Sequence, residues 1–240
     1  MSDPMGVTDA SGPADRAGFW AASLTALLAA VSFGLAITTP PRTGPYAAAG
    51  SALAYPYAAA ARFVPRDFVW MYPALLMMLA FLLLAACVRE RAAGYRKLFG
   101  TIGLCLATVS FTVIALDYFI QLRTVQPALR RGELEGLAII SQYNPHGVFI
   151  ALEELGLLVM GLSFACLALA LGASRLERVT RWVYLISSAL IVAAFVGMSW
   201  YFGLGIECRF EVTAIALGWL TLTASGVLLA FVFRRGARRA

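Results

Sequence analysis

The sequence predicts an all-α membrane protein built as a bundle of six transmembrane helices. Two properties of the composition indicate this class: 61% of the 240 residues are hydrophobic and only 13% are charged, against about 25% charged residues in a typical soluble protein. The third observation is a set of apolar stretches, each long enough to cross roughly 30 Å of hydrocarbon as a helix. We place these six spans at 17–38, 68–88, 99–122, 147–172, 182–203 and 211–233.

The spans are expected to form a single transmembrane domain, 17–233, between a flexible N-terminus, 1–16, and a basic tail, 234–240. The residues before Asp15 contain no basic side chain, so we interpret the first span as a transmembrane helix and not as a cleaved signal peptide.

The distribution of basic residues predicts the orientation of the bundle. Twelve of the 19 Lys and Arg residues fall in the segments that share a side with the N-terminus, and seven fall in the longer loops opposite. Because basic loops resist translocation, we expect both termini in the cytoplasm and the chain in a bacterial inner membrane as a multi-pass protein. The net charge of +6 suits anionic membrane lipid as the partner, and no nucleic acid is needed to explain it.

The outer loops are the most elaborate part of the sequence. The first, 39–67, is rich in Ala, Pro and Tyr, so we expect it at the membrane interface with one short helix near 57–63. In the second, 123–143, apolar residues alternate with charges after Pro127, which predicts an amphipathic helix on the membrane surface. In the short third loop we expect Glu207, Arg209 and Glu211 to be ordinary solvated charges.

The most informative stretch is Asn144-Pro145-His146-Gly147, which opens the fourth span and contains the only histidine of the chain. Asn144 fits a helix cap and Pro145 fits the first helical position. At 100° per residue, His146 and Glu153 then lie within about 20° on one helix face, and Glu154 lies about 80° away from His146.

The depth of the two acids suggests a pocket. Glu153 and Glu154 lie roughly 10 Å inside the helix start, where a lipid-facing charge costs about 3 kcal/mol, so we expect them to face the bundle with at least one protonated. Asp117 and Gln121 share a face near the outer end of the third span. We therefore predict one outward-opening pocket, with Asp117, His146, Glu153 and Glu154 as acid/base groups and Tyr118, Gln121, Asn144, Trp200 and Tyr201 as substrate-binding walls.

Two structural alternatives stand beside this hypothesis. Intramembrane acids can tie helices together through hydrogen bonds alone. Trp200 and Tyr201 are also the residues that an aromatic belt at the membrane surface would contain.

Several kinds of chemistry are excluded by what the sequence lacks. One histidine cannot build a zinc site of two or three imidazoles, and no phosphate loop, nucleophile elbow or dinucleotide fingerprint is present. A hard cation held by carboxylates stays open. We expect no metal and no cofactor.

Two short runs carry resemblances to known families. Gln142-Tyr143-Asn144-Pro145-His146-Gly147, leading into Ala151-Leu152-Glu153-Glu154-Leu155-Gly156, resembles a motif of small bacterial membrane proteins of uncharacterised function. Leu152-Glu153-Glu154 is similar to the Pro-x-Glu-Glu element of membrane lycopene cyclases, with Ala151 in place of the proline. That resemblance implies intramembrane acids that protonate an isoprenoid.

Three functions follow from these observations. The first is a membrane-embedded enzyme that uses Glu153 or Glu154 as general acid and His146 or Asp117 as base on a lipid-soluble substrate, an isoprenoid or another lipid. The second is a small-molecule, cation or proton binding or transport protein that uses the same acids. The third is a sensor or accessory subunit of a larger membrane complex.

Overall fold

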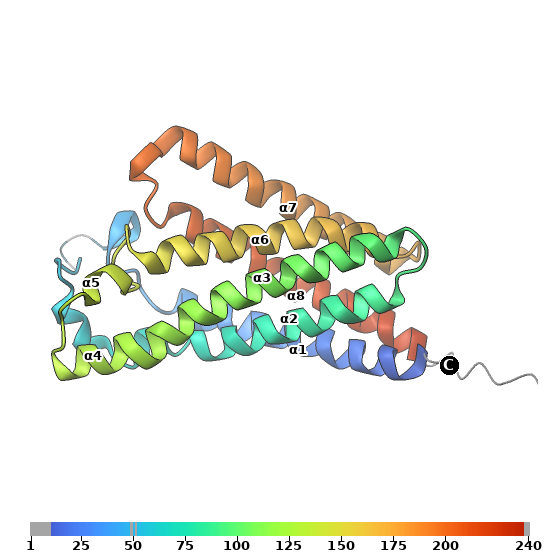
Figure 1. The fold of residues 1–240 in the computed structure, drawn as a ribbon, viewed down its shortest axis with the longest axis horizontal. Coiled ribbons are helices and arrows are strands. Elements are labelled where there is room, and N and C mark those ends of the chain that lie inside the picture. Colours follow the sequence, from blue (N-terminus) through green and yellow to red (C-terminus); the bar gives the residue numbers. More distant parts are fainter. Residues whose placement is uncertain (1–10, 49, 51, 238–240) are drawn as a thin grey trace, which may run out of the picture.

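The predicted bundle of transmembrane helices is confirmed. The structure is a computed structural model that describes residues 11–48, 50 and 52–237 (Figure 1). Within these ranges, six helices are long and apolar enough to cross a membrane. The long helices are α1 (Ser11–Ile37), α2 (Met71–Arg91), α3 (Arg96–Ile120), α6 (Val148–Ala170), α7 (Arg175–Phe202) and α8 (Arg209–Ala237).

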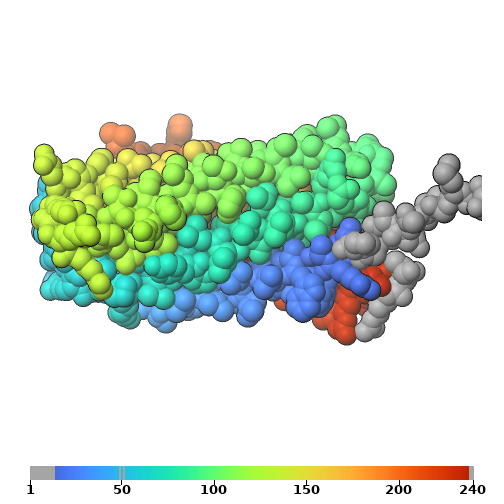
Figure 2. All heavy atoms as spheres, turned by 60° about the horizontal axis from the view of Figure 1, so that its bottom comes forward, coloured from blue at the N-terminus to red at the C-terminus, as the bar shows by residue number. Residues whose placement is uncertain are grey.

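The long helices form a closed ring. Each packs against the next in chain order, α1 on α2, α2 on α3, α3 on α6, α6 on α7 and α7 on α8, and α1 on α8 closes the ring. Figure 2 shows α1, α2 and α3 running side by side along one face. Helix α6 also contacts α8 across the ring, so residues distant in sequence meet in the interior.

The ring has two different ends. We call the end that carries the segments 38–70, 121–147 and 203–208 the loop end. The opposite end, which carries the short connections 92–95 and 171–174 together with the start of α1 and the end of α8, is called the basic end (Figure 1). The placement of both termini in the cytoplasm stays a prediction.

Small residues allow the helices to approach closely in the middle of the bundle. A Cβ atom on Gly156 of α6 would lie 2.6 Å from Ile114 of α3, and one on Gly226 of α8 would lie 2.7 Å from the backbone oxygen of Ala22 of α1. Such contacts are typical of membrane helix interfaces, where packing replaces the hydrophobic effect as the driving force.

Two buried serines add hydrogen bonds at the same interface between α3 and α6. Ser110 donates to the backbone oxygen of Gly156 at 2.8 Å, and Ser163 donates to that of Gly103 at 2.8 Å. Both donors are satisfied without any charge.

The second outer loop differs from the prediction of a separate surface helix. It is helical after Arg123, but as a continuation of α3 through a π-helical turn, η4 (Gln121–Val125), into α4 (Gln126–Arg131). A proline inside an α-helix lacks a donor and clashes with the carbonyl four residues earlier. The wider π turn lies just before Pro127, where α4 begins, so the helix continues instead of breaking.

The remaining short elements lie at the loop end. They are η1 (Gly44–Tyr46), η2 (Ala58–Phe63), η3 (Arg66–Phe68), α5 (Leu137–Ile140) and η5 (Gly203–Gly205). Helix η2 confirms the short helix predicted near 57–63.

Helix extends into both segments that were predicted to flank the bundle, the flexible N-terminus and the basic tail. Helix α1 begins at Ser11 and α8 continues to Ala237. The rest of the predicted N-terminal segment, 1–10, and of the tail, 238–240, lies outside the described residues.

Helix α7 is buried mainly through its first half, and its second half packs more loosely, through Phe195 on Phe210 of α8. Its buried residues lie between Thr180 and Ile191, and Figure 1 shows the second half leaning away from α6 toward the loop end. Trp200 and Tyr201, which were predicted to line the pocket, lie on this part and are 91% and 80% exposed.

Candidate functional site

Two carboxyl groups meet where α6 crosses α8 near the loop end. Glu153 of α6 has no exposed surface, and its carboxyl group accepts a hydrogen bond from the hydroxyl group of Tyr118 on α3. The carboxyl group of Glu211, in the first turn of α8, lies beside it. Two neighbouring carboxyl groups can form a hydrogen bond with each other only when one of them carries a proton.

Two more acids surround this pair. Asp117 of α3 is 1% exposed and lies near both Glu153 and Glu211. Glu154 is half-buried next to the backbone of Glu211. We call Asp117, Glu153, Glu154 and Glu211 the carboxyl cluster.

The carboxyl cluster lacks the partners that buried acids usually have. None of its four members forms an ion pair with a basic side chain among the described residues. One oxygen each of Asp117, Glu153 and Glu154 is buried without a hydrogen-bond donor in the same part of the chain. No group of acids, cysteines or histidine there is arranged to hold a metal ion.

Aromatic side chains pack around the cluster. The ring of Tyr118 packs edge-on against Trp70 with ring centres 5.1 Å apart, and it stacks on Phe149 at 6.2 Å. Trp70 in turn contacts Trp219 at 5.8 Å. These rings fix the direction of the Tyr118 hydroxyl group and keep the cluster in a medium of low polarity, where charge interactions are strong.

A pocket of about 480 Å³ opens at the loop end beside the cluster. It lies between the loop-end parts of α1, α6 and α8, with lining residues from the segments 39–46, 67–70 and 142–145, and Glu211 is the cluster member that lines it. Most of the other lining is apolar or aromatic and includes Phe33, Ile37, Trp70, Tyr143, Phe149 and Ile215.

An ion pair holds the rim of this pocket. Arg42 forms two hydrogen bonds with Asp67, 3.0 Å from Nε and 3.2 Å from the terminal nitrogen, and its guanidinium group lies 3.7 Å from the ring centre of Phe63. Tyr143 donates to the same carboxylate at 3.3 Å. The hydrogen bond to Asp67 raises the pKa of Arg42, whereas burial and then the Asp67 charge raise the pKa of Tyr143.

Gln121 ties the second outer loop to α3. Its amide nitrogen donates to the backbone oxygen of Ile140 at 2.6 Å, and its oxygen accepts from the backbone nitrogen of Gln142 at 3.1 Å. Gln142 then reaches the backbone oxygen of Asp67 at 3.4 Å. Gln121 therefore positions the loop that carries Tyr143 to the pocket, and its own amide is occupied by these bonds.

The start of the fourth span differs from the prediction. Helix α6 begins at Val148 with Gly147 as its cap residue, so Pro145 and His146 precede the helix. Asn144 turns the chain: its side-chain oxygen accepts from the backbone nitrogen of His146 at 3.0 Å and its amide donates to the backbone oxygen of Ala138 at 3.0 Å. His146 is exposed and does not share the buried face of Glu153.

The structure thus brings together Asp117, Tyr118, Glu153 and Glu154 of the predicted site, with Gln121 supporting the adjacent loop. His146, Trp200 and Tyr201 lie on the surface. Sequence reasoning missed Glu211, because an acid at the start of a span looks like a solvated end residue. The available signal was its position: Glu211 begins a span at the loop end, the same end at which Asp117 and Glu153 lie inside theirs.

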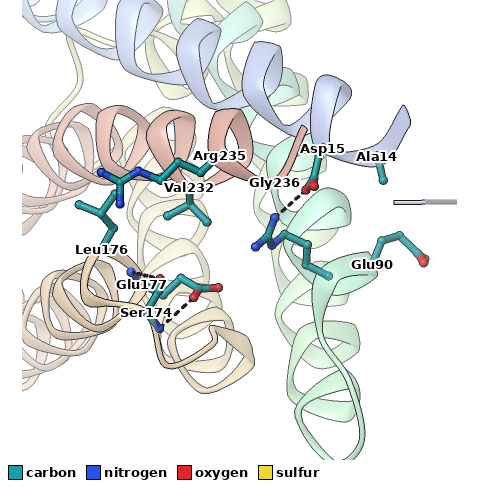
Figure 3. Close-up of a pocket in the computed structure, with 10 residues that line it drawn as sticks. Ala14, Asp15, Glu90, Ser174, Leu176, Glu177, Val232, Arg235 and Gly236 are labelled. Atoms are coloured by element: carbon teal, nitrogen blue, oxygen red, sulfur yellow. Dashed lines mark hydrogen bonds and ion pairs between the residues drawn. The ribbon is translucent and has the colours of Figure 1, made fainter. Parts of the chain in front are cut away.

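A second pocket, of about 630 Å³, lies at the basic end. Two of its acids are bonded to neighbouring protein groups, as Figure 3 shows: Asp15 pairs with Arg91, and Glu177 accepts from the backbone nitrogen of Ser174. These contacts give the residues structural roles, so we take the loop-end pocket as the candidate site.

Comparison with protein-family models, with curated proteins and with solved structures found no match for this chain. The resemblances to small bacterial membrane proteins and to lycopene cyclases stay predictions.

Proposed function

We propose that this integral membrane protein is an acid/base enzyme that binds a lipid-soluble molecule in the loop-end pocket and exchanges a proton with it through Glu211. The observation that carries the proposal is the position of Glu211, which lines an apolar pocket and also lies beside the buried Glu153. The sequence assigned the role of general acid to Glu153 or Glu154. We assign this role instead to Glu211, the carboxyl group that a ligand in the pocket can contact.

The geometry supplies what proton transfer requires. A general acid must lie within hydrogen-bond reach of its substrate and hold a proton near neutral pH. Glu211 lies beside Glu153, so a proton on Glu211 avoids two adjacent negative charges, and the hydroxyl group of Tyr118 donates to Glu153. When Glu211 gives that proton to the substrate, its carboxylate is left ionised, and Tyr118 is the donor that stabilises the neighbouring carboxyl group of Glu153.

The middle of the bundle favours a site that opens at one end. Between the carboxyl cluster and the basic end, α3 and α6 are in close contact at Gly103 and Gly156, and the serines there are bonded to backbone oxygens. A transport path would have to separate these helices. This observation favours binding and chemistry over transport.

The test compares lipid extracts by mass spectrometry. Membranes that contain the wild-type protein are compared with membranes that contain Glu211→Gln, Ala216→Trp, which fills the pocket wall, or the control Glu133→Gln on the exposed loop. We expect one lipid-soluble compound to accumulate and another to disappear in the first two variants, and no change in the control. Identical extracts from folded wild-type, Glu211→Gln and Ala216→Trp proteins would refute the proposal.

A further inference from the structure

The loop-end pocket contains acids that no basic side chain among the described residues compensates. Glu211 lines it with Glu153, Glu154 and Asp117 behind it, and in the described part of the chain none of these acids has a basic partner. In this medium of low polarity the charge of an ionised acid is screened weakly. It favours a ligand that brings positive charge.

The nearby arginines do not supply that charge. Arg42 lines the pocket, but its guanidinium group is held by both oxygens of Asp67 and by the face of Phe63. Arg209 pairs with Glu207 at 3.7 Å and donates to the backbone oxygen of Gly205 at 2.6 Å. An anionic ligand would therefore have to displace an existing pair before it found a cation.

The walls of the pocket suit a positive group on an apolar body. Phe33, Trp70, Tyr143 and Phe149 line the pocket together with Glu211, and the faces of aromatic rings attract ammonium groups. The volume of about 480 Å³ lies within the range of roughly 300–1,000 Å³ that holds small organic ligands.

We infer that the loop-end pocket selects a lipophilic cation, a molecule with an apolar body and a basic or quaternary nitrogen that contacts Glu211. This inference rests on the proposed function, because it names the chemical class of the molecule that the pocket binds. Both an aminolipid headgroup and a free lipophilic amine carry this chemistry.

Binding of such a cation is linked to protons. Glu211 faces Glu153, Glu154, Asp117 and Tyr118 from α6 and α3, with Cys208 beside it at the start of α8. A permanent cation at Glu211 competes with a proton on Glu211, so the cation releases that proton when it binds. Its affinity therefore rises as the pH is raised.

Tetraphenylphosphonium is a suitable probe, because it is a permanent lipophilic cation, and tetraphenylborate is an anion of nearly the same shape. Equilibrium binding is measured on the purified full-length protein in dodecyl maltoside, an uncharged detergent without nitrogen. We expect saturable binding of the cation, tighter at alkaline than at acidic pH, and none of the anion. We expect Glu211→Gln to bind the cation about 10- to 150-fold more weakly, the effect of losing one charged contact. The control Glu133→Gln should bind it as the wild type does.

Competition identifies the source of the nitrogen. Phosphatidylethanolamine that displaces the probe indicates an aminolipid, and dodecylamine that displaces it while the phospholipid does not indicates a free amine. If neither competes, or if the anion binds as well as the cation, the inference is wrong.

The two proposals fail separately. A neutral compound that depends on Glu211 in the lipid extracts, without binding of the phosphonium probe, overturns the cation inference and leaves the proposed function in place. Probe binding that depends on Glu211, with unchanged extracts, overturns the acid/base step and leaves the cation site.

Discussion

The ion pair between Arg42 and Asp67 should be the largest single polar contribution to the stability of the loop end. The carboxylate is 2% exposed and the guanidinium side chain 15% exposed, so solvent screens the pair little. Removal of one partner of a buried pair costs about 3–5 kcal/mol. Because Arg42 would keep its contact with the ring of Phe63, we place Asp67→Ala at the lower limit, about 3 kcal/mol.

The assay is thermal unfolding in detergent, followed by the fluorescence of tryptophan. Trp70 is a useful reporter, because its ring nitrogen donates to the backbone oxygen of Asp67 at 3.0 Å. For chains of this size, 1 kcal/mol shifts the melting temperature by about 2–4 °C, so Asp67→Ala should lower it by about 6–12 °C. The exposed pair Arg131 and Glu133, 4.0 Å apart and 72% and 63% exposed, is the matched control, and its alanine variants should shift it by under about 2 °C.

A double-mutant cycle decides whether the cost comes from the pair itself. Arg42→Ala combined with Asp67→Ala leaves no unpaired charge, so the double variant should be more stable than the sum of the single effects by about 2 kcal/mol. Coupling below about 0.5 kcal/mol, the range of independent sites, would show that the two side chains act separately and would refute this reasoning.

Three other predictions use the same chain. Gly226→Ala should lower the melting temperature, because its Cβ would lie 2.7 Å from the backbone of α1 and overpacking costs about 1–3 kcal/mol. Gly197 has open space around it, so Gly197→Ala should raise the stability by about 0.5–1 kcal/mol in the same melting assay. Tyr118→Phe removes the donor to Glu153 but keeps the ring, so the free energy of unfolding, measured by denaturant titration, should fall by about 1–3 kcal/mol. Burial raises the pKa of Cys208 to about 12, and only the thiolate reacts with N-ethylmaleimide. Alkylation of Cys208 near pH 8, measured by peptide mass spectrometry, should therefore be roughly a thousandfold slower than that of a free thiol. Its rate should still rise with pH above 10. A lowered melting temperature for Gly197→Ala would contradict the first prediction, and an unchanged free energy of unfolding for Tyr118→Phe would contradict the second. An alkylation rate of Cys208 that levels off near pH 9 would contradict the third.

The spans could be predicted because hydropathy reports a property of each segment alone. A helix in hydrocarbon must satisfy its own backbone, so a long apolar run is sufficient evidence for it. Packing decides which helices are in contact across the ring. The hydropathy of the sequence does not indicate the contact between α6 and α8. Glu211 was missed for this reason: its role depends on a helix that is distant in sequence.

Local errors came from helix boundaries. The prediction that His146 shares a face with Glu153 assumed a helix that starts at Pro145. Gly147 is extended and α6 begins at Val148. The rule of 100° per residue therefore does not apply to the histidine, which lies before the helix. The predicted surface helix assumed that Pro127 starts a new element. A π turn there keeps the helix continuous, and hydrophobic periodicity does not show such a turn.

The unpartnered oxygens of the carboxyl cluster support the proposal that the cluster does more than hold helices together. The bundle has such devices already, since Ser110 and Ser163 join α3 to α6 with every donor used. The carboxyl cluster instead leaves an oxygen of Asp117 buried without a donor within the described chain, which costs about 1–3 kcal/mol. A structural network gains nothing from that cost, whereas a site that must receive a proton or a cation needs an acceptor that the protein itself leaves free.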